Sequence, residues 1–356
     1  MLPTDNRLNE FLRMLEPIVK PEAQLFAPIF WEDQNALLVK QTVDYPWESL
    51  QPKAVQTGDL PGVCWWLLHQ QEKGNQIVKQ QIDQVQKQYQ WELRYLLEKS
   101  EKELYLRTSF LLNYFALACQ LGGQNVENQD FLLHLPIEQY IEQMVHRLTV
   151  PLSFAAGITP MSITLARLCR VLPLKSSLSI IIRDWLNDLT GLIRQYLLPV
   201  RMNEQLFSFF PTSISRSDDT CETAQHLTWA FGDLNQVFLF RAVAPVLNDM
   251  ALLKLAERVG EFTTFHQALE AKLVEDISVG RGTAGLTLMY DQLYRQTGSS
   301  AYLKARSYWL ERTTAQSFPP TDTTSADFLH GPIGTFLALQ AIRKPDNLLA
   351  SILFLN

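Results

Sequence analysis

Three glycines, Gly280, Gly282 and Gly285, stand in a GxGxxG spacing just before an apolar run. In a dinucleotide site, such glycines follow a buried strand and lead into a helix whose N-terminus binds the pyrophosphate. Here the preceding residues 271–276, AKLVED, carry three charges and no β-branched run. A helical pattern also replaces the second strand and its acidic residue, expected about 20 positions later. A nucleotide site is disfavoured, so the glycines need another explanation.

Cysteine and histidine, the usual zinc ligands, do not group along the chain. Cys64, Cys119, Cys169 and Cys221 form no CxxC pair, and the six histidines form no HxxxH or HExxH motif. In a reducing compartment, isolated thiols of this kind are expected to be buried small hydrophobic side chains. Local spacing therefore predicts no zinc site.

The composition suits a large helical core. Of 356 residues, 47% are hydrophobic, and the formal net charge is -6. That charge, without any run of lysine or arginine, argues against a nucleic-acid partner. The first 20 residues lack the layout of a secretory signal and instead predict an amphipathic helix, and no apolar stretch reaches the roughly 18 residues of a membrane span. We expect a cytoplasmic protein without a membrane span.

Helical periodicity dominates the chain. Helices are predicted over 137–148, 161–172 and 177–198. Val78, Ile82, Val85 and Tyr89 predict a further helix in a glutamine-rich stretch, either an ordinary surface helix or a coiled coil that binds a partner. Strand signals are scarce. Residues 20–75 and 199–224 are expected to be irregular.

The glycines fit a repeat. Gly232, Gly282 and Gly331 each open an apolar helix, at intervals of 50 and 49 residues, and Gly157 is an earlier candidate. Other helices are predicted between these, so the repeating unit is a helix pair. Stacked helix pairs form an open solenoid or a closed ring. In a ring, the glycine-led helices form the inner layer, and the free N–H groups at their starts face a central cavity.

At this point the sequence resembles a known family, the lanthionine synthetase C (LanC) and LanC-like proteins. Residues 226–259 resemble the family's WCYGD segment, residues 279–313 its CHGTAG segment, and residues 327–339 its final glycine-led helix. The resemblance implies an all-α fold, an α/α toroid that forms a single domain over 1–356. It also implies a cyclase that uses zinc to add peptide cysteine thiols to dehydroalanine or dehydrobutyrine, forming thioether rings.

The family's zinc ligands are missing. Where the family has two cysteines and a histidine, this chain has Ala230, Gly280 and Arg281. None of these replaces a thiolate or an imidazole as a zinc ligand. The family's tyrosine next to the first cysteine aligns with Phe231, which cannot transfer a proton. We therefore expect no cofactor. A metal site rebuilt from His226, His330 and Asp233 is the alternative.

The resemblance and its departures lead to a hypothesis of function. The chain is expected to be a zinc-free, degenerate LanC-like cyclase that binds or scaffolds a dehydrated precursor peptide of lanthipeptide biosynthesis, with a dehydratase as a possible partner. Arg281 is expected either to bind a peptide carboxylate or stabilise a developing anion, or simply to pair with an acidic neighbour. The expected binding cavity is lined by His226, Trp229, Phe231, Asp233, Arg281 and His330.

Two enzymatic alternatives remain open. The first is a metal-independent cyclase, since thiol addition to a dehydroamino acid proceeds slowly without a metal and positioning alone can direct it. The second is a glycosidase, because similar helical rings host that chemistry. A glycosidase needs two opposed carboxylates, for which the glycine-led motifs offer Asp233 and Asp327.

Overall fold

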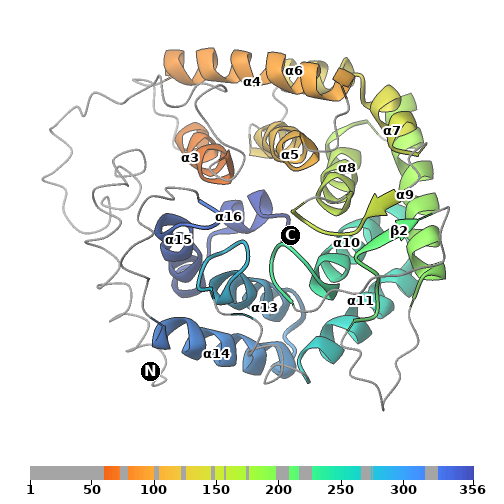
Figure 1. The fold of residues 1–356 in the computed structure, drawn as a ribbon. Helices are drawn as coiled ribbons and strands as arrows, with labels where there is room; N and C mark the ends of the chain where they lie inside the picture. The colour runs from red at the N-terminus through yellow and green to blue at the C-terminus, as the bar shows by residue number, and fades with distance from the viewer. Residues whose placement is uncertain are drawn as a thin grey trace, which may run out of the picture.

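The computed structural model shows two concentric layers of helices closed into a ring (Figure 1). This confirms the expected α/α toroid. The predicted N-terminal amphipathic helix, His226, Asp327 and Gly157 lie outside the residues that the structure describes. The described residues are 60–72, 79–99, 104–121, 126–145, 149–155, 158–173, 176–197, 208–215, 227–265, 274, 276–316 and 328–356.

The inner layer contains the glycine-led helices and helices that precede them in the chain. Neighbouring inner helices contact one another from α3 through α5 and α8 to α10, and from α13 to α15. Their bounds are α3 Leu60–Glu72, α5 Tyr105–Leu121, α8 Thr159–Val171, α10 Asp233–Leu247, α13 Thr283–Thr297 and α15 Pro332–Arg343.

The outer helices have one apolar face, which packs on the inner layer. Inner helices α5, α8, α10 and α13 contact outer helices α4, α9, α11 and α14 respectively. The predicted helices over 137–148, 161–172 and 177–198 are confirmed as α7, α8 and α9. The outer bounds are α4 Lys79–Lys99, α6 Val126–Leu133, α7 Ile137–Val145, α9 Ser177–Gln195, α11 Met250–Thr263 and α14 Ser300–Ala315.

The expected irregular stretches are partly regular. Helix α3 lies inside residues 20–75, so that expectation is wrong for Leu60–Glu72. In the described part of 199–224, residues 208–215, strand β2 (Ser213–Ser215) pairs antiparallel with β1 (Thr149–Pro151). The glutamine-rich helix is α4, and its residues Ile82, Val85 and Tyr89 are buried against the same chain, as in an ordinary surface helix.

The last ten residues lie at the centre of the ring. Helix α16 (Asn347–Ile352) contacts α3 and α5, and residues 352–355 are fully buried. The ring of Phe354 stacks on that of Phe110, with centroids 5.0 Å apart. Arg167 donates to the carbonyl oxygens of Ser351 and Asn356, at 3.1 and 3.2 Å. The centre of the ring is therefore filled by the chain itself.

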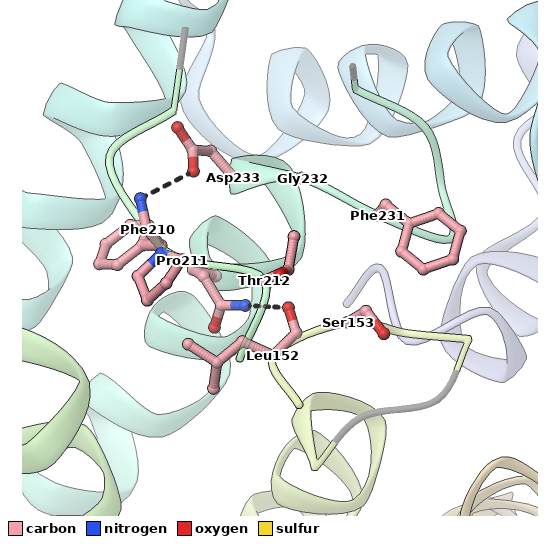
Figure 2. Close-up of a pocket in the computed structure, with 9 residues that line it drawn as sticks. Leu152, Ser153, Phe210, Pro211, Thr212, Phe231, Gly232 and Asp233 are labelled. Carbon is pink, nitrogen blue, oxygen red and sulfur yellow. Dashed lines mark hydrogen bonds between the residues drawn. The ribbon is translucent and has the colours of Figure 1, made fainter. Parts of the chain in front are cut away.

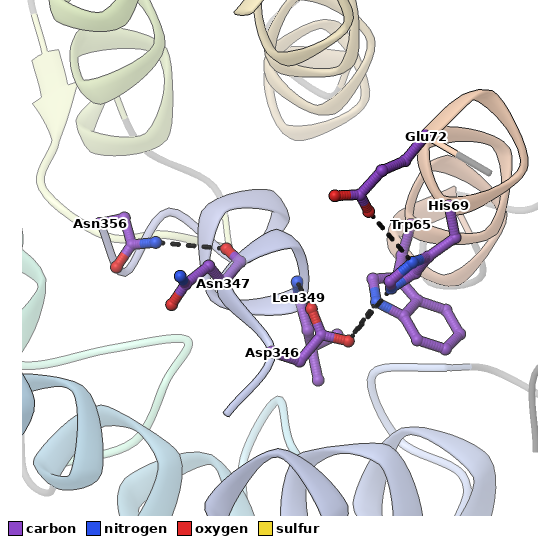
Figure 3. A network of polar contacts seen from close by, with 7 residues as sticks. All are labelled: Trp65, His69, Glu72, Asp346, Asn347, Leu349 and Asn356. Carbon is purple, nitrogen blue, oxygen red and sulfur yellow. Dashed lines mark hydrogen bonds and ion pairs between the residues drawn. The ribbon is translucent and has the colours of Figure 1, made fainter. Parts of the chain in front are cut away.

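An aspartate fixes the start of this central segment (Figure 3). Asp346 accepts from the backbone N–H of Leu349 at 2.9 Å, which caps α16. Its other oxygen accepts from Trp65 Nε1 at 2.8 Å and lies 3.3 Å from His69 Nε2, both on α3. Burial raises the pKa of Asp346, but these hydrogen bonds and the His69 charge outweigh it and lower the pKa overall. These contacts join α3, the first described helix, to the segment that follows α15.

None of the described helices combines the length and the apolar character that crossing a bilayer requires.

Candidate functional site

Three loops at one end of the ring hold the equivalent positions of the repeat. They are residues 229–232, 279–282 and 328–331, and they precede α10, α13 and α15. Each ends in the glycine at the helix N-cap, Gly232, Gly282 or Gly331. The spacing of 50 and 49 residues therefore marks one structural position, as the repeat predicted.

Helices α13 and α15 each pack closely on the loop that precedes them. In each helix, a glycine of the first turn lies against the carbonyl oxygen of the residue six positions earlier. A Cβ on Gly285 would lie 1.9 Å from the oxygen of Val279, and a Cβ on Gly334 would lie 1.7 Å from that of Phe328. Such distances exclude any side chain, so glycine is required there. In α10 the equivalent residue is Asn235. Its Nδ2 instead donates to the equivalent carbonyl, that of Trp229, at 2.9 Å.

Backbone hydrogen bonds join the loops to one another. The N–H of Gly280 donates to Leu329 O at 2.7 Å, and the N–H of Ala230 donates to Gly280 O at 2.9 Å. Ala230 O accepts in turn from Phe154 N at 3.1 Å. We call Ala230, Gly280 and Leu329 the floor positions. Their backbone groups bind loop to loop, so main-chain hydrogen bonds hold the floor together.

The expectation that helix-start N–H groups face a cavity is wrong for α13. Its first donors, Thr283 N, Ala284 N and Gly285 N, bond to the carbonyl oxygens of residues 276–278 at 2.9, 3.4 and 3.3 Å. Helix α15 begins with Pro332, which has no N–H. The donors of α13 are therefore already satisfied by its own loop, and its start is not an anion site.

The residues next to the floor point outward. Phe231, Arg281 and His330 occupy equivalent places in the three loops, and we call them the rim positions. Phe231 is partly exposed, and the other two are exposed. His330 Nε2 lies 3.1 Å from the place of a Cβ on Gly280, so its ring leans over that floor position. Among the described residues no carboxylate pairs with Arg281.

Trp229, predicted to line the cavity, lies in the core. Only 1% of its surface is exposed, its Nε1 donates to Leu353 O at 3.1 Å, and its ring packs on Phe110 and Phe154. The prediction is corrected for this residue, because the central segment covers the indole. Trp229 therefore supports the floor from below and offers no surface to a ligand.

Asp233 is also buried, and it holds a neighbouring segment (Figure 2). Its carboxylate accepts from Ser208 Oγ and Phe209 N at 2.7 Å, and from Phe210 N at 3.2 Å. Burial raises its pKa to about 6, although the three hydrogen bonds lower it. The sequence suggested a helix-start residue that holds backbone donors. It does hold them, but they belong to residues 209 and 210 rather than to α10.

The segment that Asp233 holds, residues 208–210, continues into one wall of a small pocket beside Phe231 (Figure 2). The walls are mostly apolar, with polar groups from Ser153, Thr212 and Gln236. Sequence reasoning missed the contribution of residues 152–153 and 210–212, because they are distant in the chain from the glycine-led motifs. The pocket residues are Leu152, Ser153, Phe210, Pro211, Thr212, Phe231, Gly232, Asp233 and Gln236.

The residues present do not fit zinc. Ala230 and Gly280 have no donor atom, and Arg281 carries a permanent charge of the wrong sign. Within the described residues, no three histidine, cysteine or carboxylate side chains gather as a metal site would require. A site rebuilt on Asp233 is disfavoured as well, because its oxygens already accept three hydrogen bonds. The same contacts remove Asp233 as a glycosidase carboxylate.

Comparisons with known proteins bear on the fold. No protein-family model matches the sequence, and no curated protein matches it. Among solved structures, a nisin cyclase superposes with a TM-score of 0.66 over 85% of this chain and 81% of its own, at 14% sequence identity. The chain therefore has the α/α toroid fold of a LanC-type cyclase.

Proposed function

We propose that this chain is a LanC-like protein of lanthipeptide biosynthesis that binds or scaffolds a dehydrated precursor peptide without zinc. The observation that carries the proposal is the contrast within the three loops. The backbone of the floor is intact and hydrogen-bonded from loop to loop, whereas Ala230 and Gly280 supply no ligand. The scaffold of a cyclase-like ring is thus retained after its metal chemistry has been removed.

The rim supplies a binding surface for a peptide. Arg281 provides a fixed positive charge, which suits a peptide carboxylate. Phe231 is partly exposed beside Arg281 and provides an apolar surface for a peptide side chain. Because the central segment fills the ring behind the floor, a peptide would lie across this end of the toroid rather than pass through it. A dehydratase that supplies the dehydrated peptide is the natural partner.

The first experiment measures zinc per chain by mass spectrometry of the tag-free protein. The proposal expects well below one zinc per chain. As a positive control, the triple variant Ala230→Cys, Gly280→Cys, Arg281→His is expected to bind zinc, provided that His330 and the backbone oxygen of Leu329 both move by a few tenths of an ångström to admit the new Cβ. One zinc per wild-type chain would overturn the zinc-free proposal.

A second experiment separates a scaffold from a metal-independent cyclase. A dehydrated, cysteine-containing precursor peptide is incubated with and without the protein, and the loss of free thiol is followed. A scaffold binds the peptide and leaves the rate and pattern of ring formation unchanged. A metal-independent cyclase accelerates the reaction or changes the ring pattern, through positioning alone. Failure of the peptide to bind at all would contradict both.

A further inference from the structure

A short stretch of chain closes one side of the candidate site. Residues 208–212, which we call the strap, lead into strand β2, and residues 210–212 form part of the wall of the pocket beside Phe231 (Figure 2). In this closed arrangement the pocket has a volume of about 10 Å³, which is room for one water molecule. A peptide side chain can enter this pocket only if the strap moves.

The strap is tied to the start of α10 by one carboxylate. Asp233 Oδ1 accepts from Ser208 Oγ at 2.7 Å and from Phe210 N at 3.2 Å, and its Oδ2 accepts from Phe209 N at 2.7 Å. The ring of Phe209 is buried and packs edge-on against that of Phe262 on α11. A single ionisable group therefore receives three of the hydrogen bonds that hold the strap in place.

No opposite charge compensates this buried carboxylate. Asp233 is 1% exposed, and among the described residues neither a cation nor a second carboxyl shifts its pKa. The groups that face it from the strap are the Ser208 hydroxyl and the N–H groups of residues 209 and 210. Phe262 behind the strap and residues 152–153 across the pocket carry no ionisable group. Burial therefore outweighs the three hydrogen bonds and raises the pKa of Asp233 to about 6.

We propose that the strap is a pH-sensitive gate, held most firmly in acid and released more easily at neutral pH, when the buried Asp233 carboxyl carries its charge. Water solvates a carboxylate better than the closed site does, so the charged form favours any opening that exposes it. Opening widens the pocket beside Phe231, between the strap and residues 152–153. The purpose of the gate, to admit a side chain of the bound peptide, rests on the proposed function. The gating itself does not need a peptide.

The size of the effect follows from the same linkage. The closed strap binds the Asp233 proton more tightly than the open strap, in which the carboxyl meets water and has its ordinary pKa near 4. The ratio of open to closed molecules is therefore lowest at pH 4 and rises until pH exceeds about 6. Because the two pKa values differ by about two, the increase is about 100-fold at most.

The test is hydrogen exchange of the full chain without peptide, followed by mass spectrometry from pH 4 to 8 and corrected for the intrinsic exchange rate. The amides of the strap are expected to be less protected than those of α10 and little affected by dilute urea, because the strap opens without unfolding of the ring. Their protection should fall by up to about 100-fold between pH 4 and pH 7. Protection that is constant with pH would overturn the proposal. So would a strap with the protection and urea dependence of α10, which would open only with the whole chain.

Three variants assign the effect to Asp233. Asp233→Asn should abolish the pH dependence of strap exchange, and a dependence that survives in this variant would contradict the proposal. Ser208→Ala removes one donor to the carboxylate, which raises its pKa, so the change should move to higher pH. Asp249→Asn, which alters the partly buried aspartate that caps α11, is the matched control and should leave the dependence unchanged. Circular dichroism confirms folding of each variant.

The link to peptide binding is tested separately. A dehydrated precursor peptide should bind more tightly at pH 7.5 than at pH 5, and Asp233→Asn should remove the part of this difference that the gate causes. Equal pH dependence of binding in the wild type and Asp233→Asn would overturn the role of the strap in binding. A peptide that fails to bind at any pH would instead contradict the proposed function, whereas the exchange experiment would still decide whether the gate exists.

Discussion

The floor and the rim of the three loops stand one residue apart and obey different constraints. At the floor, Ala230, Gly280 and Leu329 are buried, and their backbone groups bond from loop to loop. At the rim, Phe231, Arg281 and His330 share no chemistry and meet solvent. The floor and the helix starts behind it carry the fold through backbone contacts. The rim side chains take no part in the backbone hydrogen bonds between the loops, so we expect chemistry to be able to change there without loss of the toroid.

The largest loss of stability is expected when a methyl group is added to a helix glycine that packs against one of the loops. Gly285→Ala and Gly334→Ala place a Cβ at 1.9 and 1.7 Å from a backbone oxygen, which forces the loop off the helix. We expect each to cost roughly 3 kcal/mol of unfolding free energy. Chemical denaturation measures the effect. Gly191→Ala in α9 is the matched control. Nothing lies within 4 Å of its Cβ, so it should stabilise by about 1 kcal/mol. Equal effects at the three positions would contradict the steric account.

Asn235 tests whether the polar version of the same contact is equally important. Its side chain accepts from Phe154 N and donates to Trp229 O, both at 2.9 Å and both buried. Asn235→Ala removes the donor to Trp229 O and leaves Phe154 N with only its bond to Ala230 O, so we expect a loss of about 2 kcal/mol. Asn235→Asp keeps the acceptor for Phe154 N and should cost less than Asn235→Ala at low pH. If alanine were neutral, the contact would not hold the loop.

Much of the fold around the three loops could be predicted from the sequence, because these loops belong to a repeat. Gly232, Gly282 and Gly331 predicted the starts of α10, α13 and α15, and the resemblance predicted the toroid. Helix α3 was missed for a physical reason. Ten of its thirteen residues are buried, so its sequence has no polar face and no helical periodicity to detect. Helix α5 is buried all round in the same way.

The candidate site was less predictable, because it is built by contacts between distant segments. No local pattern near Trp229 indicates that Leu353 covers it, 124 residues later. Nor does the sequence around Asp233 indicate that it holds residues 208–210. The repeat relates Arg281 to His330, and the structure places both at equivalent, exposed positions. That they line a cavity mouth stays a prediction. Their role in binding stays a prediction.

The buried carboxyl of Asp233 is expected to make the unfolding free energy depend on pH. Burial raises its pKa to about 6, so the folded state holds its proton more tightly than the unfolded state does. The contribution of this group to stability is therefore present at pH 4 and is lost as pH rises through about 6, by on the order of 2 kcal/mol. Denaturation of the wild type and of Asp233→Asn from pH 4 to 8 isolates the effect. The difference between the two should move in favour of the variant as pH rises, and a constant difference would show that the carboxyl does not titrate there.

The smallest effect on stability is expected at the rim, where the effect on binding should be largest. Arg281→Ala and His330→Ala remove exposed side chains, so we expect changes within about 0.5 kcal/mol in unfolding free energy. Arg281→Ala should weaken binding of a dehydrated precursor peptide, because it removes the one rim cation that no described carboxylate neutralises. Arg281→Lys keeps the charge and should retain part of the affinity. The loss should also shrink when the carboxylates of the peptide are converted to amides. If Arg281→Ala bound both forms of the peptide as tightly as the wild type, Arg281 would be no more than a solvated surface residue, and the proposed role of its charge in binding would be wrong.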